Sequence, residues 1–278
     1  MPLPIHLAVN RYYVVRDELI AHEPAAWGEV VRLCALVPAQ VSVDTFWQFG
    51  KDKPCWSNIT VAIGGRIAAD LTLSPDFASH HVVAGPAWEI HMIEAGPSWK
   101  KRTNFQAVGV AASQFLTSLA PGGLQSYPWR LFAIRQFAQS LTGGDALQMV
   151  QELIDNHFDF GTSGIYAWSS RFAQHAGRGW GATTVQHMLT DLGLGVKPDL
   201  HLRRSAVRMG LLGPEVPSNL PDAEIDARAT ALDPLVVRAI IAMAPHVQPT
   251  AIPGAASALR EIDKVLMEWS RQGLARPL

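Results

Sequence analysis

The stretch GWGATTVQHMLTDLGLGVKPDLHLRR, residues 179–204, joins a glycine-rich turn, a helix and an isolated carboxylate. Its apolar residues recur at the spacing of one helix face: Val185, Met188, Leu189 and Leu192. This spacing predicts an amphipathic helix over 182–192. Three glycines precede that helix and follow another helical segment: Gly177, Gly179 and Gly181. Because glycine permits positive φ angles and close backbone approach, we expect a tight helical hairpin here.

The backbone N–H groups of this turn, with a helix N-terminus behind them, form a donor array suited to one phosphate. The alternative is an ordinary helix–helix turn, and the glycines alone favour that alternative. The residues that follow favour the phosphate-binding turn. In the segment KPDLHLRR, Pro198 and Asp199 mark the start of a new helix. Asp199 is expected to be its N-cap. A capping aspartate also presents its carboxylate at the mouth of the helix, so capping and catalysis are compatible.

Composition narrows the class of protein. The chain has 278 residues, 48% hydrophobic and 17% charged, which is typical of a globular protein with a well-buried core. A net charge of −1 excludes a protein that coats nucleic acid through overall charge. The two cysteines, Cys34 and Cys55, have no metal-type spacing and favour a reducing cytoplasm. We expect no signal peptide and no membrane span.

Positive charge is nevertheless concentrated near the glycine turn. The segment 171–210 contains six basic residues, Arg171, Arg178, Lys197, Arg203, Arg204 and Arg208. It contains only two acidic residues, Asp191 and Asp199. A basic face around a phosphate-binding turn is what contact with a nucleic-acid backbone needs.

The sequence predicts a mostly α fold with a small α+β N-terminal part. In residues 1–100, which are irregular and strand-prone, we expect a helix near 25–37 and a short antiparallel sheet. That sheet would comprise a hairpin turning at Gly64 and Gly65 within 58–74, and a strand near 87–95. Residues 101–278 are expected to form a helical domain, with a first helix capped by Asn104. Its further helices are predicted near 127–141, 143–158, 163–177, 233–244 and 254–269, with the hairpin at about 165–192 and the aspartate segment at 197–210.

Together the turn, the helix and PDLHLRR resemble the helix-hairpin-helix DNA glycosylases, endonuclease III-like and alkylpurine glycosylase-like. Members resembling endonuclease III carry a pattern like L-P-G-V-G-x-K-T-A, then a helix, then V-D-T-H-x-x-R. Here GRGWGATTV stands for the hairpin, and Asp199, His201 and Arg204 match the second motif. The resemblance covers roughly residues 165–210. The proline before the first hairpin glycine is absent, and the interval from Gly181 to Asp199 is slightly short.

The resemblance implies that Asp199 is catalytic. It also implies DNA contacts from Gly177, Arg178, Gly179, Gly181, Thr183, Thr184, His201 and Arg204. Bifunctional members hold a Schiff-base lysine where this chain has Thr183, and threonine cannot form that adduct. The resemblance therefore implies a monofunctional enzyme that leaves an abasic site, without lyase activity.

Excision of a base requires that the base leave the stack, and aromatic side chains usually receive it. The candidates for a base pocket are Trp47, Trp56, Trp129 and Trp168, with packing in the core as the alternative for each. No His/Cys cluster in the sequence resembles a metal site, and we expect no cofactor. Binding of a monovalent cation at the hairpin is left as an alternative. The expected partner is double-stranded DNA containing a modified base, bound by a monomer.

Three functions stay open at this point. The first is excision of a hypermodified phage base, such as glucosylated hydroxymethylcytosine, in antiphage defence. The second is base-excision repair of alkylated or oxidised bases. The third is a helix-hairpin-helix protein that binds DNA without catalysis, in which Asp199 is only a cap. The length of the chain ahead of the hairpin and its nine tryptophans favour an enzyme.

Overall fold

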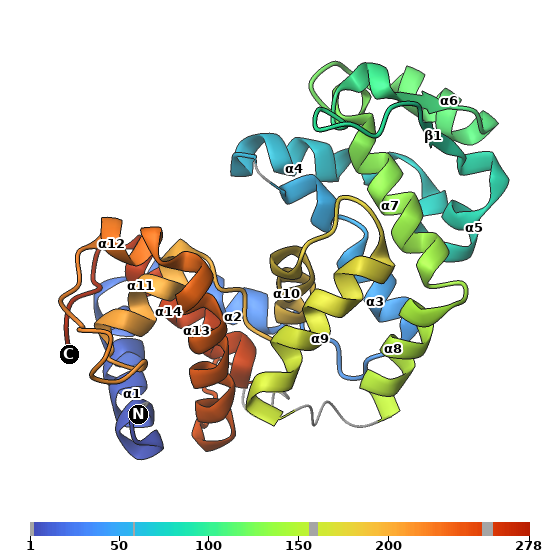
Figure 1. Cartoon of the computed structure of the whole chain (residues 1–278). Coiled ribbons are helices and arrows are strands. Elements are labelled where there is room, and N and C mark those ends of the chain that lie inside the picture. The colour runs from blue at the N-terminus through green and yellow to red at the C-terminus, as the bar shows by residue number, and fades with distance from the viewer. Residues whose placement is uncertain (1–2, 58, 156–160, 252–257) are drawn as a thin grey trace. The chain divides into compact units, whose positions relative to one another are not determined.

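The structure, a computed structural model, describes residues 3–57, 59–155, 161–251 and 258–278 (Figure 1). It is mostly helical and has one small two-stranded sheet, which confirms the expected α-rich class. The chain forms two compact units. The first unit comprises 1–40, 159–168 and 189–278, and the second comprises 41–158 and 169–188.

The first unit is built around the C-terminal helix. Its helices are α1 (Ile5–His22), α2 (Pro24–Cys34), α11 (Leu200–Arg208), α12 (Asp222–Ala227), α13 (Ala229–Met243) and α14 (Ala258–Arg271). Helix α14 contacts α1, α2, α11 and α13. The N-terminal helix is tied to it by polar contacts: the Tyr12 hydroxyl donates to the fully buried Glu261 at 2.7 Å, and Trp269 Nε1 donates to Glu18 at 3.0 Å. These contacts hold together segments from both ends of the chain.

The second unit is centred on α7 (Pro128–Ser140), most of whose side chains are buried. Around it lie α3 (Val43–Gly50), α4 (Val61–Asp70), α5 (His80–Ala84), α6 (Val110–Ser118), α8 (Asp145–Asp155) and short 3₁₀ turns. Phe137 of α7 packs on Trp47 and Trp180, with ring centroids 6.0 and 4.4 Å away. Helices α9 (Gly161–Ala176) and α10 (Ala182–Asp191) contribute residues to both units.

The sheet is antiparallel and small. Strand β1 (Ile90–Met92) pairs with β2 (Phe105–Ala107), with Ile90 opposite Ala107. The predicted strand near 87–95 is therefore confirmed over 90–92, whereas 86–88 form a 3₁₀ turn. Its partner is not the predicted hairpin but a strand that follows an intervening loop, residues 93–104.

The predicted hairpin over 58–74 is wrong, because residues 61–70 form helix α4. Both glycines lie inside the helix, and Gly64 serves close packing rather than a turn. A Cβ on Gly64 would lie 2.7 Å from the ring of Trp56, so glycine allows the indole to approach the helix. A short apolar run is ambiguous between strand and helix, and this one is helical.

Two further expectations need correction. The helix expected to start at Asn104 begins at Val110 with Gly109 as its N-cap, since residues 105–107 are used by β2. The strand-prone region at the N-terminus is instead helix α1, with Tyr12, Val15 and Leu19 fully buried on one side. The expected helix ends at 156–158 and 254–257 lie outside the described residues.

The compact units also differ from the expected division at residue 100. Residues 1–40 join the C-terminal helices because α1 and α2 pack on α14. Among the described residues, no helix is both long enough and apolar enough to span a membrane.

Candidate functional site

The glycine turn between α9 and α10 has the expected backbone. Gly177 and Gly179 have φ angles of 103° and 102°, in the region that favours glycine. The turn is closed by a hydrogen bond from the Trp180 N–H to the Gly177 carbonyl at 3.2 Å. All four apolar residues of the predicted stripe, 185, 188, 189 and 192, are buried. The helix–turn–helix arrangement is therefore present.

This turn is packed against α7. A Cβ on Gly177 would lie 2.8 Å from the Gln136 side chain, and one on Gly179 would lie 2.7 Å from the Ala133 Cβ. Trp180 is buried and donates from Nε1 to the Ala133 carbonyl at 3.2 Å. Both positive-φ glycines are thus required by the fold itself. Gly181 differs, because a Cβ there would meet nothing within 4 Å.

Donors for an anion remain at the start of α10. The Arg178 N–H already donates to Gln136 Oε1 at 2.7 Å. In the described part of the chain, the N–H groups of 181–184 have no protein acceptor. Thr183 is exposed in this first helical turn, and Thr184 is partly exposed. The turn therefore offers unpaired amides at a helix N-terminus, an arrangement that binds phosphate in other proteins.

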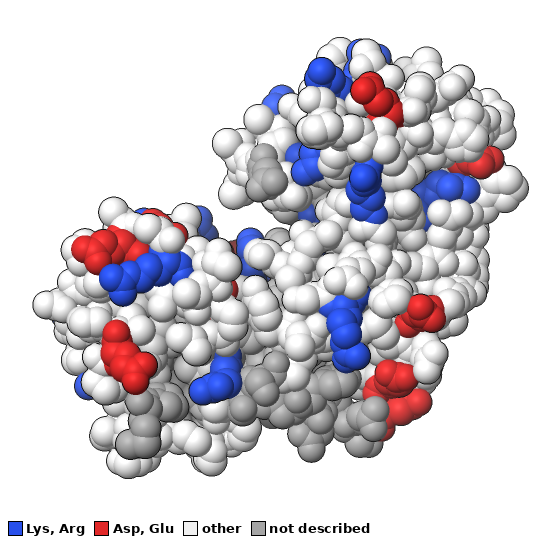
Figure 2. Space-filling model, in the orientation of Figure 1, with Lys and Arg blue, Asp and Glu red and all other residues white. Residues whose placement is uncertain are grey.

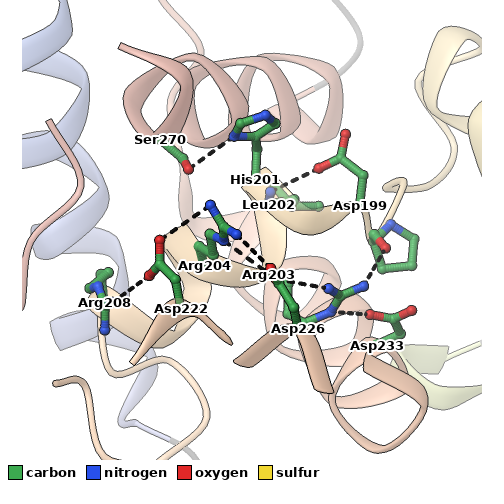
Figure 3. Close-up of polar contacts among 11 residues, drawn as sticks. Asp199, His201, Leu202, Arg203, Arg204, Arg208, Asp222, Asp226, Asp233 and Ser270 are labelled. Carbon is green, nitrogen blue, oxygen red and sulfur yellow. Dashed lines mark hydrogen bonds and ion pairs between the residues drawn. The ribbon is translucent and has the colours of Figure 1, made fainter. Parts of the chain in front are cut away.

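Asp199 is the N-cap of α11, as predicted. Its φ and ψ are −85° and 179°, and its Oδ1 accepts from the Leu202 N–H at 2.9 Å (Figure 3). Its Oδ2 has no donor among the described residues. The segment before it is fixed, because the Lys197 N–H donates to Asp263 of α14 at 3.2 Å. One carboxylate oxygen is held in place and the other is available to a ligand.

Two further carboxyl groups, those of Asp233 and Asp263, lie near Asp199. Burial raises the pKa of Asp233 above its ordinary value, and the charge of Asp199 adds to this effect. Burial likewise raises the pKa of Asp263, which Lys264 and Arg260 only partly offset. Asp199 is partly exposed, whereas Asp263 is almost fully buried and Asp233 pairs with Arg203 at 2.7 Å.

The basic residues of α11 are used within the first unit. Arg204 pairs with Asp226 at 2.5 Å and with Asp222 at 3.2 Å, and Arg208 pairs with Asp222 at 2.5 Å (Figure 3). His201 Nδ1 lies 3.1 Å from the Ser270 hydroxyl. The local positive surplus counted along the sequence is therefore offset by carboxylates from α12 and α13. The phosphate contacts expected from His201 and Arg204 would require these side chains to exchange partners.

The four candidate pocket tryptophans do not form one wall. Trp47 and Trp168 are buried in the second and first unit, respectively. Trp56 donates to Asp52 at 2.9 Å and packs on α4. Trp129 is also buried, but it lies among cationic side chains, which distinguishes it from the others.

The structure therefore groups the predicted residues into two sets. The turn residues 177–184 lie in the second unit, and Asp199, His201 and Arg204 lie together in the first. The loop that contains Trp99, Lys100 and Lys101 packs beside the turn and was not among the predicted site residues. A tryptophan followed by three basic residues was the available signal.

In the ranges that the structure describes, no group of three or more His, Cys, Asp or Glu residues is arranged to hold a metal ion. Compared with known proteins, the chain matches no protein-family model, no curated protein and no solved structure.

Proposed function

We propose that this protein is a monofunctional DNA N-glycosylase, which excises a flipped-out modified base from duplex DNA and leaves an abasic site. The observation that supports this most is the carboxylate of Asp199. It stands at the N-terminus of α11 with one oxygen hydrogen-bonded and the other without a protein donor among the described residues. A positioned and accessible carboxylate is what cleavage of an N-glycosidic bond requires.

Cleavage of that bond builds positive charge on the sugar as the base departs. The carboxylate of Asp199 stabilises this oxocarbenium-like state, or directs water onto the sugar carbon. The hydrogen bond from the Leu202 N–H fixes the carboxylate, so that little reorganisation accompanies the reaction.

The glycine turn binds the DNA backbone. The unpaired N–H groups of 181–184 donate to one phosphate, and this contact is independent of base sequence. Thr183, exposed in the same helical turn, offers a hydroxyl where a lyase would need an amine. These features support hydrolysis of the base without cleavage of the strand.

A second candidate is a DNA-binding protein without catalysis. The hydrogen bond by which Asp199 caps α11 favours this second candidate, because helix capping alone accounts for an aspartate at position 199. The two functions differ in one measurable product, the free base.

The test is a digestion of DNAs that contain alkylated purines, oxidised guanine, mismatches or glucosylated hydroxymethylcytosine, with released bases identified by mass spectrometry. We expect one class of base to be released by the wild type, and none by Asp199→Asn. We expect the DNA product to break only after alkali or heat, and borohydride not to trap the protein on DNA. DNA binding without release of any base would support the second candidate. Borohydride trapping would contradict the monofunctional mechanism.

The identity of the released base separates the biological roles. Alkylated or oxidised bases indicate repair, whereas a hypermodified phage base indicates antiphage defence.

A further inference from the structure

The loop between β1 and β2 carries an exposed run of positive charge. Lys100, Lys101 and Arg102 are consecutive and all exposed. The loop is held by the Asn104 side chain, which donates to the Ser98 carbonyl at 3.1 Å. Arg178 of the glycine turn also reaches the loop, and donates to the Ala95 carbonyl at 3.4 Å. We call residues 97–102 the basic loop.

Cations and indole rings alternate where this loop meets α7. Arg178 lies 5.3 Å from the Trp99 ring, and Lys100 lies 5.5 Å from the same ring. Lys100 also lies 4.4 Å from the Trp129 ring, and Arg130 lies 4.3 Å from that ring. These five side chains form a cation–π ladder, and Trp99 is its half-exposed aromatic member.

The ladder gathers like charges without a carboxylate. Among the described residues, none of Lys100, Lys101, Arg102, Arg130 and Arg178 forms an ion pair. Figure 2 shows several blue side chains on the face of the second unit, with red side chains among them.

The nearby groups do not neutralise this charge. Glu89, which precedes β1, is hydrogen-bonded to His91 at 2.9 Å. Glu94, in the loop between β1 and β2, forms no ion pair with the ladder among the described residues. Burial and the charge of Arg130 lower the pKa of Lys100 from its ordinary value. Arg130 donates to the carbonyls of Pro54 and Ser57, so part of this charge is stabilised by the protein itself. The exposed cations of the basic loop have no acidic partner among the described residues, and an anion bound there would relieve their repulsion.

We propose that the basic loop and the cation–π ladder bind a nucleic-acid strand, with Lys100, Lys101, Arg102 and Arg178 on its phosphates and Trp99 against its bases or sugars. This rests on the proposed function in taking DNA as the ligand, and it identifies a second contact surface within the same unit. Alternating aromatic rings and cations favour a nucleic acid over an acidic peptide, because nucleotides offer both flat rings and phosphates.

The ladder lies beside the glycine turn, which supports one continuous surface for a nucleic-acid strand. A Cβ on Gly179 would lie 3.6 Å from Trp129 and 3.7 Å from Trp99. The unpaired amides of 181–184 follow directly in sequence. A strand held by the turn therefore passes close to the basic loop.

The test measures the affinity for unmodified duplex and single-stranded oligonucleotides at several salt concentrations. In K100Q/K101Q/R102Q we expect binding to weaken on the order of tenfold at low salt, and the salt slope to fall by about 0.9 for each lost phosphate contact. K100R/K101R/R102K preserves the charges and should bind as the wild type does. R16Q/R32Q/R228Q removes three first-unit cations that each have an acidic partner, and should change affinity little.

Binding and base release are measured separately, so the two proposals fail separately. Wild-type affinity in K100Q/K101Q/R102Q, with base release intact, would overturn the surface and leave the glycosylase. Loss of binding in that variant, with no base released by the wild type, would support the surface and overturn the enzyme. Displacement of DNA by poly-glutamate of equal charge as effectively as by competitor DNA would overturn the assignment to nucleic acid.

Discussion

Asp199 combines a structural bond with a proposed chemical role, and substitutions separate the two. Asparagine caps a helix about as well as aspartate, whereas alanine costs about 1 kcal/mol. We expect Asp199→Asn to retain the free energy of unfolding, aided by reduced repulsion with Asp233 and Asp263. Asp199→Ala should lose about 1 kcal/mol.

Both variants should release no base, while binding DNA at least as tightly as the wild type, because a negative charge is removed and no phosphate contact is lost. Urea unfolding, DNA titration and base release measure the three properties. Base release by a folded Asp199→Asn at the wild-type rate would refute the catalytic role.

The two glycines around Trp180 should respond differently to substitution. Gly179→Ala places a Cβ 2.7 Å from Ala133 at a φ of 102°, and should destabilise the protein by more than about 1 kcal/mol. Gly181→Ala meets open space and should leave stability within about 0.5 kcal/mol of the wild type.

The larger Gly181→Leu then tests the anion site without unfolding the turn. We expect weaker DNA binding for every sequence at an unchanged melting temperature. Unchanged affinity in Gly181→Leu would show that the amides of 181–184 do not contact the phosphate.

At the scale of elements, α11 is held by an ion pair that is mostly buried. Arg203 is 6% exposed and donates to Asp233 at 2.7 Å, with Asp226 as a second partner at 3.6 Å. Asp233→Asn removes the nearer of the two negative charges that pair with the Arg203 guanidinium. Loss of one partner of a buried pair costs about 3 to 5 kcal/mol. We expect about 2 kcal/mol here, because Asp226 remains and because burial already disfavours the charge of Asp233.

The matched control is Glu224→Gln, which removes an exposed pair with Arg228. Its cost should be below about 0.5 kcal/mol. Equal losses in the two variants, measured by urea unfolding, would show that Arg203 does not depend on Asp233.

The predictability of these elements follows from how local their causes are. Helix α10 and the cap at Asp199 depend on a short periodic stripe and on one side-chain bond, so the sequence predicts both. The sequence predicts a hairpin where helix α4 lies, and the packing of Gly64 against Trp56 is a contact that the local pattern does not reveal. The acidic partners of Arg203 and Arg204 lie in α13 and α12, outside residues 171–210. A count of charges within 171–210 therefore overestimates the unpaired positive charge.

At the scale of the whole molecule, Asp263 should make stability depend on pH. Its carboxylate is 2% exposed on α14, near Lys264 at 3.2 Å, and burial raises its pKa. The native state therefore binds a proton at pH values where the unfolded chain has released it. The free energy of unfolding contributed by this group falls as pH rises from the ordinary aspartate range through the raised pKa.

Asp263→Asn removes this titration and keeps an oxygen for the Lys197 N–H. The wild-type free energy of unfolding minus that of the variant should therefore decrease as pH rises from about 4 to 7, by at most about 1.4 kcal/mol per pH unit. Urea unfolding of both proteins across this range measures the difference, and the titration of Asp233, raised in the same direction, remains in both and cancels. A difference that increases with pH would mean that Lys264 and Arg260 outweigh burial, and that the charged carboxylate of Asp263 stabilises the first unit.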